Sequence, residues 1–484
     1  MAISDFAIVV LAAGKGTRLK SVLAKVLHRA GGRSLVEHVV RACRPLKSRE
    51  IIAVVGHQSE DVIAAVTPLG AKTALQEPQR GTGHAMLVAK PAIPPQAKFV
   101  IVLPGDAPLI RTETLAALVR VHRDAGAAAT ILSAEINNPA GYGRIVRRED
   151  GSVTAIVEDS ALTSDQRAIC EINSSMYCFT LEKLWPCLDS LKPQNVHKEL
   201  YLTDAIAMLR QKDENVQAVV VADPDEVLGC NTRADLAAAD AVFRRRKRAA
   251  IMEGGVTIEI PDTVQIDPEV NVGADTILEA CVQLLGKTRI GTNCTIRTGS
   301  ILTDMVVEDD VLVKPYSVLT SSHISRGAQI GPFAHFRTGV RIEENARAGN
   351  FVEMKDSVLG KGSKAMHLTY LGNARIGEGT NIGAGTITCN YDGVHKYPTT
   401  IGKRVFIGSD SALIAPVRIG DGAYVGAGSV ITKNVPADAL GVARGHQVNK
   451  LGWAAVRRRQ LAEKVETSKA LKHKKPKRKL SAHK

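Results

Sequence analysis

The chain has 484 residues, more than one hydrophobic core accommodates, so two or three domains are expected. Apolar residues make up 45% of it, no segment approaches the roughly 20 apolar residues of a membrane span, and no basic region precedes the first apolar run, so a cytoplasmic location is expected. The eight cysteines form no CxxC pair, which argues against a disulfide framework or a zinc site.

The net charge of +14 is concentrated at the C-terminus. Residues 457–484 hold twelve Lys or Arg and two Glu, net +10, which leaves +4 on the other residues. Because KHKKPKRKL contains proline and has no apolar periodicity, we expect residues 457–484 to be disordered. A solubilising tail is favoured over contact with anionic surfaces such as nucleic acid or lipid, and no specific nucleic-acid partner is expected.

The first predicted strand, FAIVVL, runs into the loop LAAGKGTRL at residues 11–19. The loop lacks the spacing of a phosphate-binding GxxxxGK[ST] motif, and Leu19 stands where a GxGxxG dinucleotide motif needs glycine. Glycine amides, a hydroxyl group and the cations Lys15 and Arg18 still suit an anion at the end of a strand, although a solvated turn is the alternative.

Up to about residue 233, apolar strands alternate with helical patterns, which predicts a mostly parallel α/β sheet. Ligands of such sheets bind at the carboxyl ends of the strands. QEPQRGTG at residues 76–83 and Pro104-Gly105-Asp106 stand at such places. Asp106 is a candidate Mg²⁺ ligand, since Mg²⁺ takes one or two protein oxygens, or else it caps the next turn.

Residues 234–254 form an Ala-rich helical pattern that ends in a basic run, RRRKR. We expect a connecting helix whose basic half is a solvated face rather than a nucleic-acid patch.

Beyond this helix, apolar residues recur every six positions. One series is Val306, Leu312, Val318, Ile324, Ile330, Phe336 and Ile342, and a second is Ile401, Ile407, Leu413, Ile419, Val425 and Ile431. A period of six predicts a parallel β-helix, which is stable only as a stack of coils. The spacing breaks between residues 342 and 376 and between residues 382 and 401, where we expect inserted loops that carry function.

The motifs together resemble one family. LAAGKGTRL, QRGTGHA, LPGDAPL, GYGRI, EIN and GCNTR, followed by NFVEMK, SKAMHLTYLG, NIGAGTITCNYDG and IGSD, are similar to the bacterial bifunctional enzymes that make UDP-N-acetylglucosamine. The resemblance implies an α/β Rossmann-like nucleotidyltransferase domain (1–233), a linker helix (234–254) and an all-β left-handed parallel β-helix acetyltransferase domain (255–456), with the tail 457–484 outside the family pattern. It also implies acetylation of glucosamine-1-phosphate by acetyl-CoA, then uridylyl transfer from UTP with release of pyrophosphate.

The resemblance implies these roles in the first domain. Arg18 and Lys25 supply charge at the transferring phosphoryl group, and Asp106 and Asn231 bind magnesium. The remaining positions that match nucleotide or sugar contacts are Leu11, Ala12, Ala13, Gly14, Gln76, Gly81, Thr82, Pro104, Gly105, Gly143, Glu158 and Asn173. Pro104 replaces an aromatic residue of some relatives.

In the second domain the resemblance implies that His367 is the general base. Arg337 and Lys355 match the sugar-phosphate clamp, and Tyr370 and Asn381 match further sugar contacts. The acetyl-CoA positions are Ala384, Asn390, Tyr391, Ser409, Ala427 and Arg444. Asn373 stands where aspartate is common, and a homotrimer is implied.

Three other functions stay open at this point. One is a different sugar-1-phosphate nucleotidyltransferase with a regulatory β-helix, against which His367 in HLTYLG argues. A second is a non-enzymatic scaffold or exchange-factor subunit, which would be expected to lack Lys25 or Asp106. A third is a zinc hydratase, although His323, His335, His367 and His395 show no recognised three-ligand spacing.

Overall fold

The computed structural model describes residues 5–193 and 199–473, with side chains as far as residue 469. The chain forms two compact units, Met1–Gly339 and Val340–Lys484.

The first unit begins with a nine-stranded sheet whose main path has the order β11-β7-β10-β6-β1-β4-β5. Strands β1, β4, β5 and β6 are parallel, as are β7 and β11, whereas β10 runs antiparallel to β6 and β7. The sheet is therefore mixed: the predicted parallel arrangement holds for β1, β4, β5, β6, β7 and β11, whereas β10 pairs antiparallel with β6, β7 and β8, and β8 with β9. The strands are β1 (Phe6–Ala12), β4 (Ile51–Val55), β5 (Lys72–Leu75), β6 (Phe99–Pro104), β7 (Ala129–Glu135), β8 (Arg144–Arg147), β9 (Val153–Val157), β10 (Glu171–Thr180) and β11 (Val216–Val220), with a separate hairpin of β2 (Arg29–Ala30) and β3 (Arg33–Ser34).

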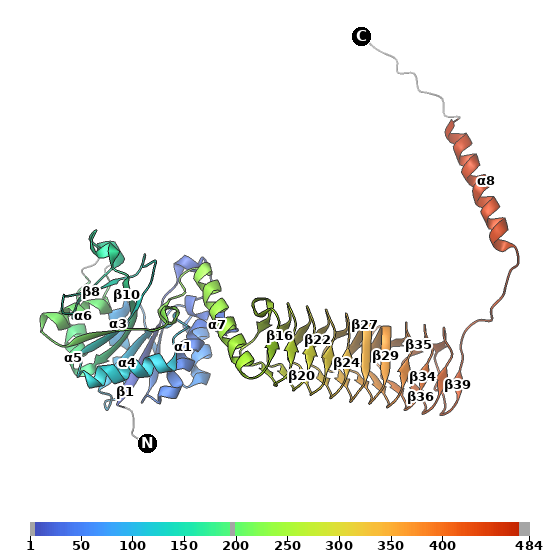
Figure 1. Cartoon of the computed structure of the whole chain (residues 1–484), viewed down its shortest axis with the longest axis horizontal. Coiled ribbons are helices and arrows are strands. Elements are labelled where there is room, and N and C mark those ends of the chain that lie inside the picture. Colours follow the sequence, from blue (N-terminus) through green and yellow to red (C-terminus); the bar gives the residue numbers. More distant parts are fainter. Residues whose placement is uncertain (1–4, 194–198, 474–484) are drawn as a thin grey trace, which may run out of the picture. The chain divides into compact units, whose positions relative to one another are not determined.

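Helices cover both faces of this sheet (Figure 1). Alternate residues of β1 face opposite sides, so Ile8 packs with helices α1, α2 and α4 while Val9 packs with α3, α5 and α6. The helices are α1 (Leu35–Cys43), α2 (Ser59–Val66), α3 (Thr82–Ala89), α4 (Thr112–Asp124), α5 (Leu181–Asp189) and α6 (Leu202–Gln211). Two apolar cores therefore hold the strand ends in fixed positions.

Helix α7 (Arg233–Glu253) follows the sheet and leads to the first coils of the β-helix. The Thr232 side chain accepts a hydrogen bond from the Asp235 backbone and the Asp235 side chain caps the Thr232 backbone, forming a capping box. The expected helix between residues 234 and 254 is thus present, with both ends one residue earlier.

The rest of the first unit is a parallel β-helix of short strands. The first pairing, Thr257 with Ile277, spans 20 residues, and the following coils pair 17 or 18 residues apart, as in Ile277 with Thr295 and Thr295 with Leu312. The strands are β12 (Thr257–Ile258), β13 (Gln265–Ile266), β14 (Asn271–Val272), β15 (Ile277–Leu278), β16 (Gln283–Leu285), β17 (Arg289–Ile290), β18 (Thr295–Ile296), β19 (Ile301–Thr303), β20 (Val306–Val307), β21 (Leu312–Val313), β22 (Val318–Thr320), β23 (His323–Ile324), β24 (Gln329–Ile330) and β25 (His335–Phe336).

The first predicted apolar series is one residue out of phase at its start. Val306 and Val318 are 43% and 39% exposed, and the buried residues are their neighbours Val307 and Leu319. In Val306-Val307 and in Val318-Leu319 both neighbouring residues are apolar, so the sequence does not show which of the two side chains faces the core. From Ile324 onward the series is buried as expected.

The second unit continues with the same kind of parallel pairing. Its strands are β26 (Arg341–Ile342), β27 (Arg347–Lys355), β28 (Val358–Leu359), β29 (Lys364–Gly372), β30 (Ala374–Ile376), β31 (Asn381–Ile382), β32 (Ile387–Cys389), β33 (Thr399–Ile401), β34 (Phe406–Ile407), β35 (Ala412–Ile414), β36 (Val417–Ile419), β37 (Tyr424–Val425), β38 (Val430–Ile431) and β39 (Leu440–Gly441). The second apolar series is buried throughout, as predicted.

Only one of the two breaks in the spacing is an insertion. Ile342 pairs with Leu359 and Leu359 pairs with Ile376, so the first break consists of two coils of 17 residues with the nine-residue strands β27 and β29 in place of an inserted loop. The second break does contain a loop, in which Tyr391 and Lys396 form an isolated bridge. The expectation of an inserted loop was therefore wrong for the first break and correct for the second.

The expected disorder of the tail was wrong in its first part. Helix α8 runs over Trp453–His473, and its described side chains are exposed. The sequence WAAVRRRQLAEK is rich in strong helix formers, a preference that outweighs its lack of an apolar face. Residues 474–484 of the predicted tail lie outside the described residues. Within the described ranges, no helix is long and apolar enough to cross a membrane.

We predict that a buried histidine makes the first domain less stable in acid. The ring of His122 is fully buried between the hydroxyls of Thr130 and Thr180, at 2.9 and 3.1 Å, and burial lowers its pKa to about 4. Its contribution to stability is present above the unfolded pKa of about 6.5 and is lost as pH falls toward 4, amounting to about 2 kcal/mol between pH 7 and pH 5.

The measurement is the unfolding midpoint of the full chain at pH 7 and pH 5, for the wild type and for His122→Gln. We expect a smaller pH dependence in the variant, with the exposed His446→Gln behaving as wild type. Equal pH dependence in all three proteins would contradict this assignment.

Candidate functional site

The carboxyl ends of β1 and β6 meet at one edge of the first sheet. Leu11 pairs with Pro104, and the Gly105 amide donates to the Leu11 carbonyl at 2.9 Å. A Cβ atom on Gly105 would lie 3.0 Å from that carbonyl oxygen and 3.3 Å from the Ala12 Cβ, so the two segments approach too closely for a larger residue. The predicted nucleotide positions of β1 and the PGD motif are thus brought together.

A cluster of charged and polar side chains lies directly beyond this edge. Lys25 forms an ion pair with Asp106 and donates to the Asn231 Oδ1 at 2.7 Å. Arg18 donates to the same Asn231 oxygen at 2.6 Å. The side chains of Lys25 and Asp106 are only 15% and 17% exposed, so the ion pair is partly shielded from water. Four residues predicted from separate parts of the sequence therefore form one site.

Helix α7 positions Asn231 in this cluster. Asp235 of the capping box accepts hydrogen bonds from the backbone amides of Asn231 and Thr232, at 2.9 and 2.8 Å. The Cys230 amide donates to the Asp106 carbonyl at 2.9 Å, which ties the two loops together. Asp106 does not cap the following helix α4, whose N-cap residue is Arg111.

The opening loop is shaped by Gly16. This residue has φ of 68°, and a Cβ atom there would lie 2.4 Å from the Cβ of Lys25, so a side chain would displace the lysine. Gly14, Lys15 and Arg18 are exposed, and nothing lies within 4 Å of the position of a Gly14 Cβ. The loop is accessible to a ligand beside the Lys25–Asp106 pair.

The QRGTG segment is held at the end of β5. The Gln76 amide donates to the Val55 carbonyl at 2.8 Å, and its side chain donates to the Gly81 carbonyl at 2.9 Å. Gly81 has φ of 95°, and a Cβ atom there would meet the Leu200 carbonyl oxygen at 2.6 Å. The Thr82 hydroxyl accepts from the Leu202 amide at 2.9 Å. These predicted uracil positions form a rigid turn.

The three predicted sugar contacts also lie together. The Asn173 amide donates to the Gly143 carbonyl at 2.8 Å, and a Cβ atom on Gly143 would lie 3.5 Å from a Glu158 carboxylate oxygen. Strand β8 pairs with both β9 and β10, which brings these positions into register.

The second group of predicted residues lies on neighbouring coils of the β-helix. In β27 and β29, Asn350 pairs with His367, Glu353 with Tyr370 and Lys355 with Gly372. His367 lies on strand β29, which corrects its expected place in a loop. It is exposed, and its Nδ1 lies 2.7 Å from the Asn350 Oδ1.

The predicted acetyl-CoA positions follow one corner of successive coils. The Asp410 amide donates to the Ala384 carbonyl at 2.7 Å, the Gly428 amide to the Ser409 carbonyl at 2.8 Å, and the Arg444 side chain to the Ala427 carbonyl at 3.0 Å. Asn381 begins β31, next to Lys364 of β29. Arg337 follows β25 in the first unit, and its role stays a prediction.

The insertion of the second unit carries two more of these positions. Asn390 is buried and donates to the Asn373 Oδ1 at 2.7 Å, so the asparagine that replaces a common aspartate still has a partner. Tyr391 is 59% exposed. The Asn390 amide nitrogen would also lie 2.7 Å from a Cβ on Gly372, which leaves no room for a side chain there.

Sequence reasoning missed three residues in these sites. Asp235 anchors Asn231, Asn350 contacts His367, and Tyr142 is hydrogen bonded to the Gly229 backbone near Asp106. Burial raises the pKa of Tyr142, with Asp235 as a further cause. The [ST]xx[DE] spacing from Thr232 to Asp235 is a signal that could have identified Asp235. The contact of Asn350 with His367 requires the coil register, which the sequence did not supply.

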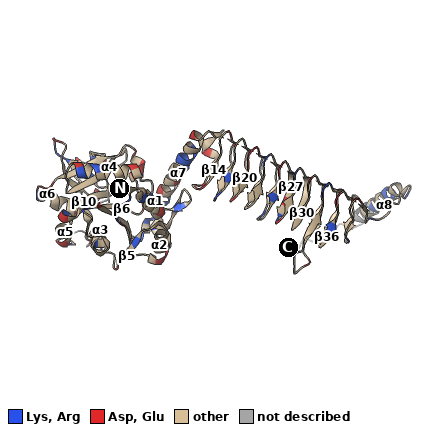
Figure 2. Cartoon of the chain, turned by 90° about the horizontal axis from the view of Figure 1, so that it is seen from below, with Lys and Arg blue, Asp and Glu red and all other residues tan. Residues whose placement is uncertain are grey.

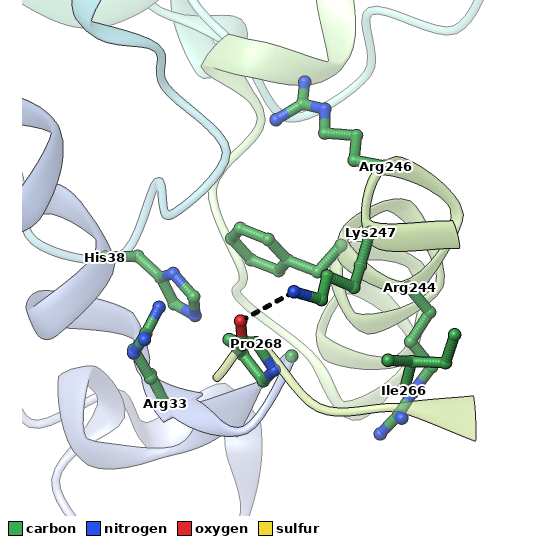
Figure 3. Close-up of a pocket in the computed structure, with 9 residues that line it drawn as sticks. Arg33, His38, Arg244, Arg246, Lys247, Ile266 and Pro268 are labelled. Atoms are coloured by element: carbon green, nitrogen blue, oxygen red, sulfur yellow. Dashed lines mark hydrogen bonds between the residues drawn. The ribbon is translucent and has the colours of Figure 1, made fainter. Parts of the chain in front are cut away.

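A cavity of about 230 Å³ lies elsewhere in the first unit, between the β2–β3 hairpin, α7 and the first coils (Figure 3). His38 stacks on Phe243 with ring centroids 3.9 Å apart, and Lys247 donates to the carbonyls of Pro268 and Val270 at 2.9 and 2.8 Å. Burial lowers the pKa of Lys247, and Arg33 contributes. The cavity lies in a structural junction rather than among the predicted site residues.

The same region corrects the interpretation of the basic run RRRKR. Arg244 pairs with Asp240, Arg245 with Asp225, Arg246 with Asp223 and Arg248 with Asp262. Figure 2 shows basic and acidic residues along α7. The run is therefore neither a freely solvated face nor an open basic patch, because its cations stabilise the contacts of α7.

The metal-ligating potential of the chain is limited to small donor sets. In the part of the chain that the structure describes, no three or more His, Cys, Asp or Glu side chains gather as a metal site. His323 contacts Glu308 at 2.7 Å rather than a second histidine. Asp106 and Asn231 offer one carboxylate and one amide oxygen, a donor set that suits Mg²⁺, which keeps several waters.

Two family models match the chain. The model of the MobA-like NTP transferase domain matches residues 8–164, and that of the bacterial transferase hexapeptide (six repeats) matches residues 398–433. The first region contains Arg18, Lys25 and Asp106 of the sheet-edge cluster, but not Asn231, and the second contains later coils of the β-helix. A solved UDP-glucose pyrophosphorylase complexed with UDP-glucose matches 50% of this chain and 98% of its own at 16% identity, but its TM-score of 0.40 is too low to support an assignment.

Curated relatives match the chain over nearly its full length. The bifunctional protein GlmU of Koribacter versatilis is 48% identical, covering 95% of this chain and 98% of the relative. The corresponding proteins of Anaeromyxobacter sp. and Streptococcus suis are 47% and 45% identical, covering 95% and 92% of this chain and 95% and 96% of their own. The chain therefore belongs to the bifunctional GlmU family, which confirms its resemblance to the bacterial uridylyltransferase–acetyltransferase enzymes.

Proposed function

We propose that the chain makes UDP-N-acetylglucosamine in two steps at two separate sites. The β-helix site acetylates glucosamine-1-phosphate with acetyl-CoA, and the sheet-edge site of residues 1–233 transfers UMP from UTP to the product. The observation that carries the proposal is the convergence of Arg18, Lys25, Asp106 and Asn231 in one cluster. Because these substrates are intracellular metabolites, we place the reaction in the cytoplasm.

In uridylyl transfer, a phosphate oxygen of N-acetylglucosamine-1-phosphate attacks the α-phosphorus of UTP and pyrophosphate leaves. Such a reaction depends on positioning and on neutralising phosphate charge. Arg18 of the opening loop and Lys25 beyond it neutralise this charge, and the exposed Gly14 lets the nucleotide approach the backbone. Gln76, Gly81 and Thr82 orient the uracil, and Gly143, Glu158 and Asn173 orient the sugar.

Asp106 and Asn231 would hold a magnesium ion in this site. The Lys25 Nζ contacts both an Asp106 carboxylate oxygen and the Asn231 amide oxygen, so these two oxygens are close enough to bind one metal ion together. The ion would add positive charge next to the phosphates. Asp235 keeps the amide oxygen of Asn231 in place, since it fixes the backbone on both sides of this position.

In acetyl transfer, the amine of glucosamine-1-phosphate attacks the thioester carbonyl of acetyl-CoA. The attacking nitrogen loses a proton, and histidine is a suitable acceptor near neutral pH. His367 takes this role, with Lys355 binding the sugar phosphate and Tyr370 and Asn381 contacting the sugar. Acetyl-CoA lies along Ala384, Ser409, Ala427 and Arg444, with Asn390 and Tyr391 at the insertion.

We further propose that three copies of the chain associate through the β-helix. Phe406 and Tyr424 stack with ring centroids 5.4 Å apart, yet remain 44% and 56% exposed on one face of the second unit. Large exposed apolar side chains in a row are typical of interaction surfaces. The tail has no role in this proposal.

Replacing the carboxylate of the sheet-edge cluster is expected to separate the two activities. Asp106→Ala removes the ion-pair partner of Lys25 and a magnesium ligand, so pyrophosphate release should fall at least about 100-fold. Coenzyme A release should stay at the wild-type rate, because the acetyl-transfer residues lie in the β-helix. Asp150→Ala, in the exposed β8–β9 turn, is the matched control. Equal loss of both activities in a folded protein would refute the assignment.

The reverse separation is expected for the β-helix site. His367→Ala should lower coenzyme A release by roughly 10²–10⁴-fold, the usual effect of removing a general base, while pyrophosphate release is unchanged. His323→Ala, on β23 of the first unit, serves as the control. A variant that acetylates at the wild-type rate across neutral pH would remove His367 from the mechanism.

Sedimentation equilibrium tests the proposed trimer. The wild type should have three times the 51.7 kDa mass of one chain, and the double variant Phe406→Glu/Tyr424→Glu should dissociate because charges replace the apolar contact. Arg404→Glu, an exposed change on the same coil as Phe406, should leave the mass unchanged. A monomeric wild type would contradict the proposal.

A further inference from the structure

The ring of His367 has one hydrogen-bond partner among the contacts of the described residues, the side chain of Asn350. The two residues are direct neighbours in the parallel pairing of β27 with β29, and Nδ1 and Oδ1 are 2.7 Å apart. Asn350 is partly buried, whereas His367 is exposed. The asparagine is thus a firmly held group that contacts the inner nitrogen of an accessible ring.

The contact determines which nitrogen of the ring carries the proton. An amide oxygen only accepts hydrogen bonds, so the Nδ1 that faces it must be the donor. In the neutral ring, Nε2 then has a free lone pair and is the nitrogen able to accept a proton. If Nε2 carried the proton instead, Nδ1 and the amide oxygen would face each other as two acceptors.

The backbone around this pair is tightly packed. A Cβ atom on Gly349 would overlap the Met366 carbonyl oxygen, so the two strands leave no room for a side chain at the position before Asn350. The Thr369 hydroxyl donates to the His367 carbonyl at 2.7 Å. These contacts restrict the positions of both residues, and such restriction is what a group that orients a reacting side chain requires.

The partner of His367 is neutral, in contrast to the carboxylate that orients histidine in many enzymes. Tyr370 pairs with Ile387 of the next coil, and this register places Ala384 opposite His367. The side chain of Ala384 is uncharged. The charged residues of the two strands themselves are Arg347, Glu353, Lys355 and Lys364. A neutral acceptor fixes the ring without placing a negative charge next to it.

We propose that Asn350 is a positioning residue for acetyl transfer, holding the Nδ1–H of His367 so that Nε2 takes the proton of the attacking amine. The amine nitrogen forms the new bond to the thioester carbon, its proton passes to Nε2, and the carbon–sulfur bond breaks. The thiolate of coenzyme A then takes up a proton as it leaves, which returns His367 to its neutral form. This inference rests on the proposed role of His367 as the base.

The test compares Asn350→Ala and Asn350→Asp in the full chain, measuring kcat and KM for glucosamine-1-phosphate across pH 5.5–9. Asn350→Ala should lower kcat about 10- to 100-fold with little change in KM, the usual effect of removing a supporting partner. Asn350→Asp keeps an acceptor and should recover most of this loss at high pH. Its carboxylate favours the protonated ring, which cannot act as the base. As the pH is lowered, the activity of this variant should therefore begin to fall about one pH unit earlier than that of the wild type.

Two controls separate positioning from a structural effect. Pyrophosphate release by the same samples reports whether the chain is folded, and Asn271→Ala changes an exposed asparagine on β14 of the first unit. In a His367→Ala background, Asn350→Ala should cause no further loss, because the asparagine acts through the histidine.

The outcomes also separate this inference from the proposed function. Asn350→Ala with wild-type kcat and an unchanged pH profile would overturn the positioning role while the effect of His367→Ala stands. Equal losses in Asn350→Ala and Asn350→Asp with no shift of the pH profile would also overturn it. If His367→Ala itself acetylates normally, the proposed base is wrong and the inference falls with it.

Discussion

Parallel pairing of neighbouring strands is the constraint on which both sites depend. In the first sheet it places the carboxyl ends of β1, β4 and β6 at one edge, so loops far apart in sequence meet there. In the β-helix it places residues of neighbouring coils side by side, as with Asn350 and His367. One backbone geometry thus positions two unrelated chemistries in a single chain.

The two sites use charge in different ways. The sheet-edge cluster holds Lys25 against Asp106 with little exposure to solvent, so its charges are already oriented before phosphate arrives. Preorganised charge of this kind avoids the cost of reorienting side chains during the reaction. The β-helix site instead holds the His367 ring by a neutral amide. Phosphate chemistry needs charge in place, whereas acetyl transfer needs a base that is free to gain a proton.

The sequence predicted the classes of fold, the strand ends and the motif residues, because apolar runs, glycines and carboxylates carry those signals locally. The sequence did not predict which of two adjacent apolar residues is buried. Val306 and Val307 are equally apolar, so only packing decides which one faces inward. The helix of residues 453–473 was missed because charge was weighed above helix propensity. The partners of RRRKR, which include Asp223 and Asp262, come from distant segments that no local pattern reveals.

The β-helix tolerates a change in coil length at a corner and not within a strand. Ala374 pairs with Thr399 across the insertion, while Arg341 pairs with Val358 in a coil without one, and both coils keep the same pairing. A single residue added within a strand would instead exchange its inward and outward faces. The Tyr391–Lys396 excursion therefore marks the kind of position where new segments can be acquired without disturbing the stack, by natural variation or by deliberate grafting.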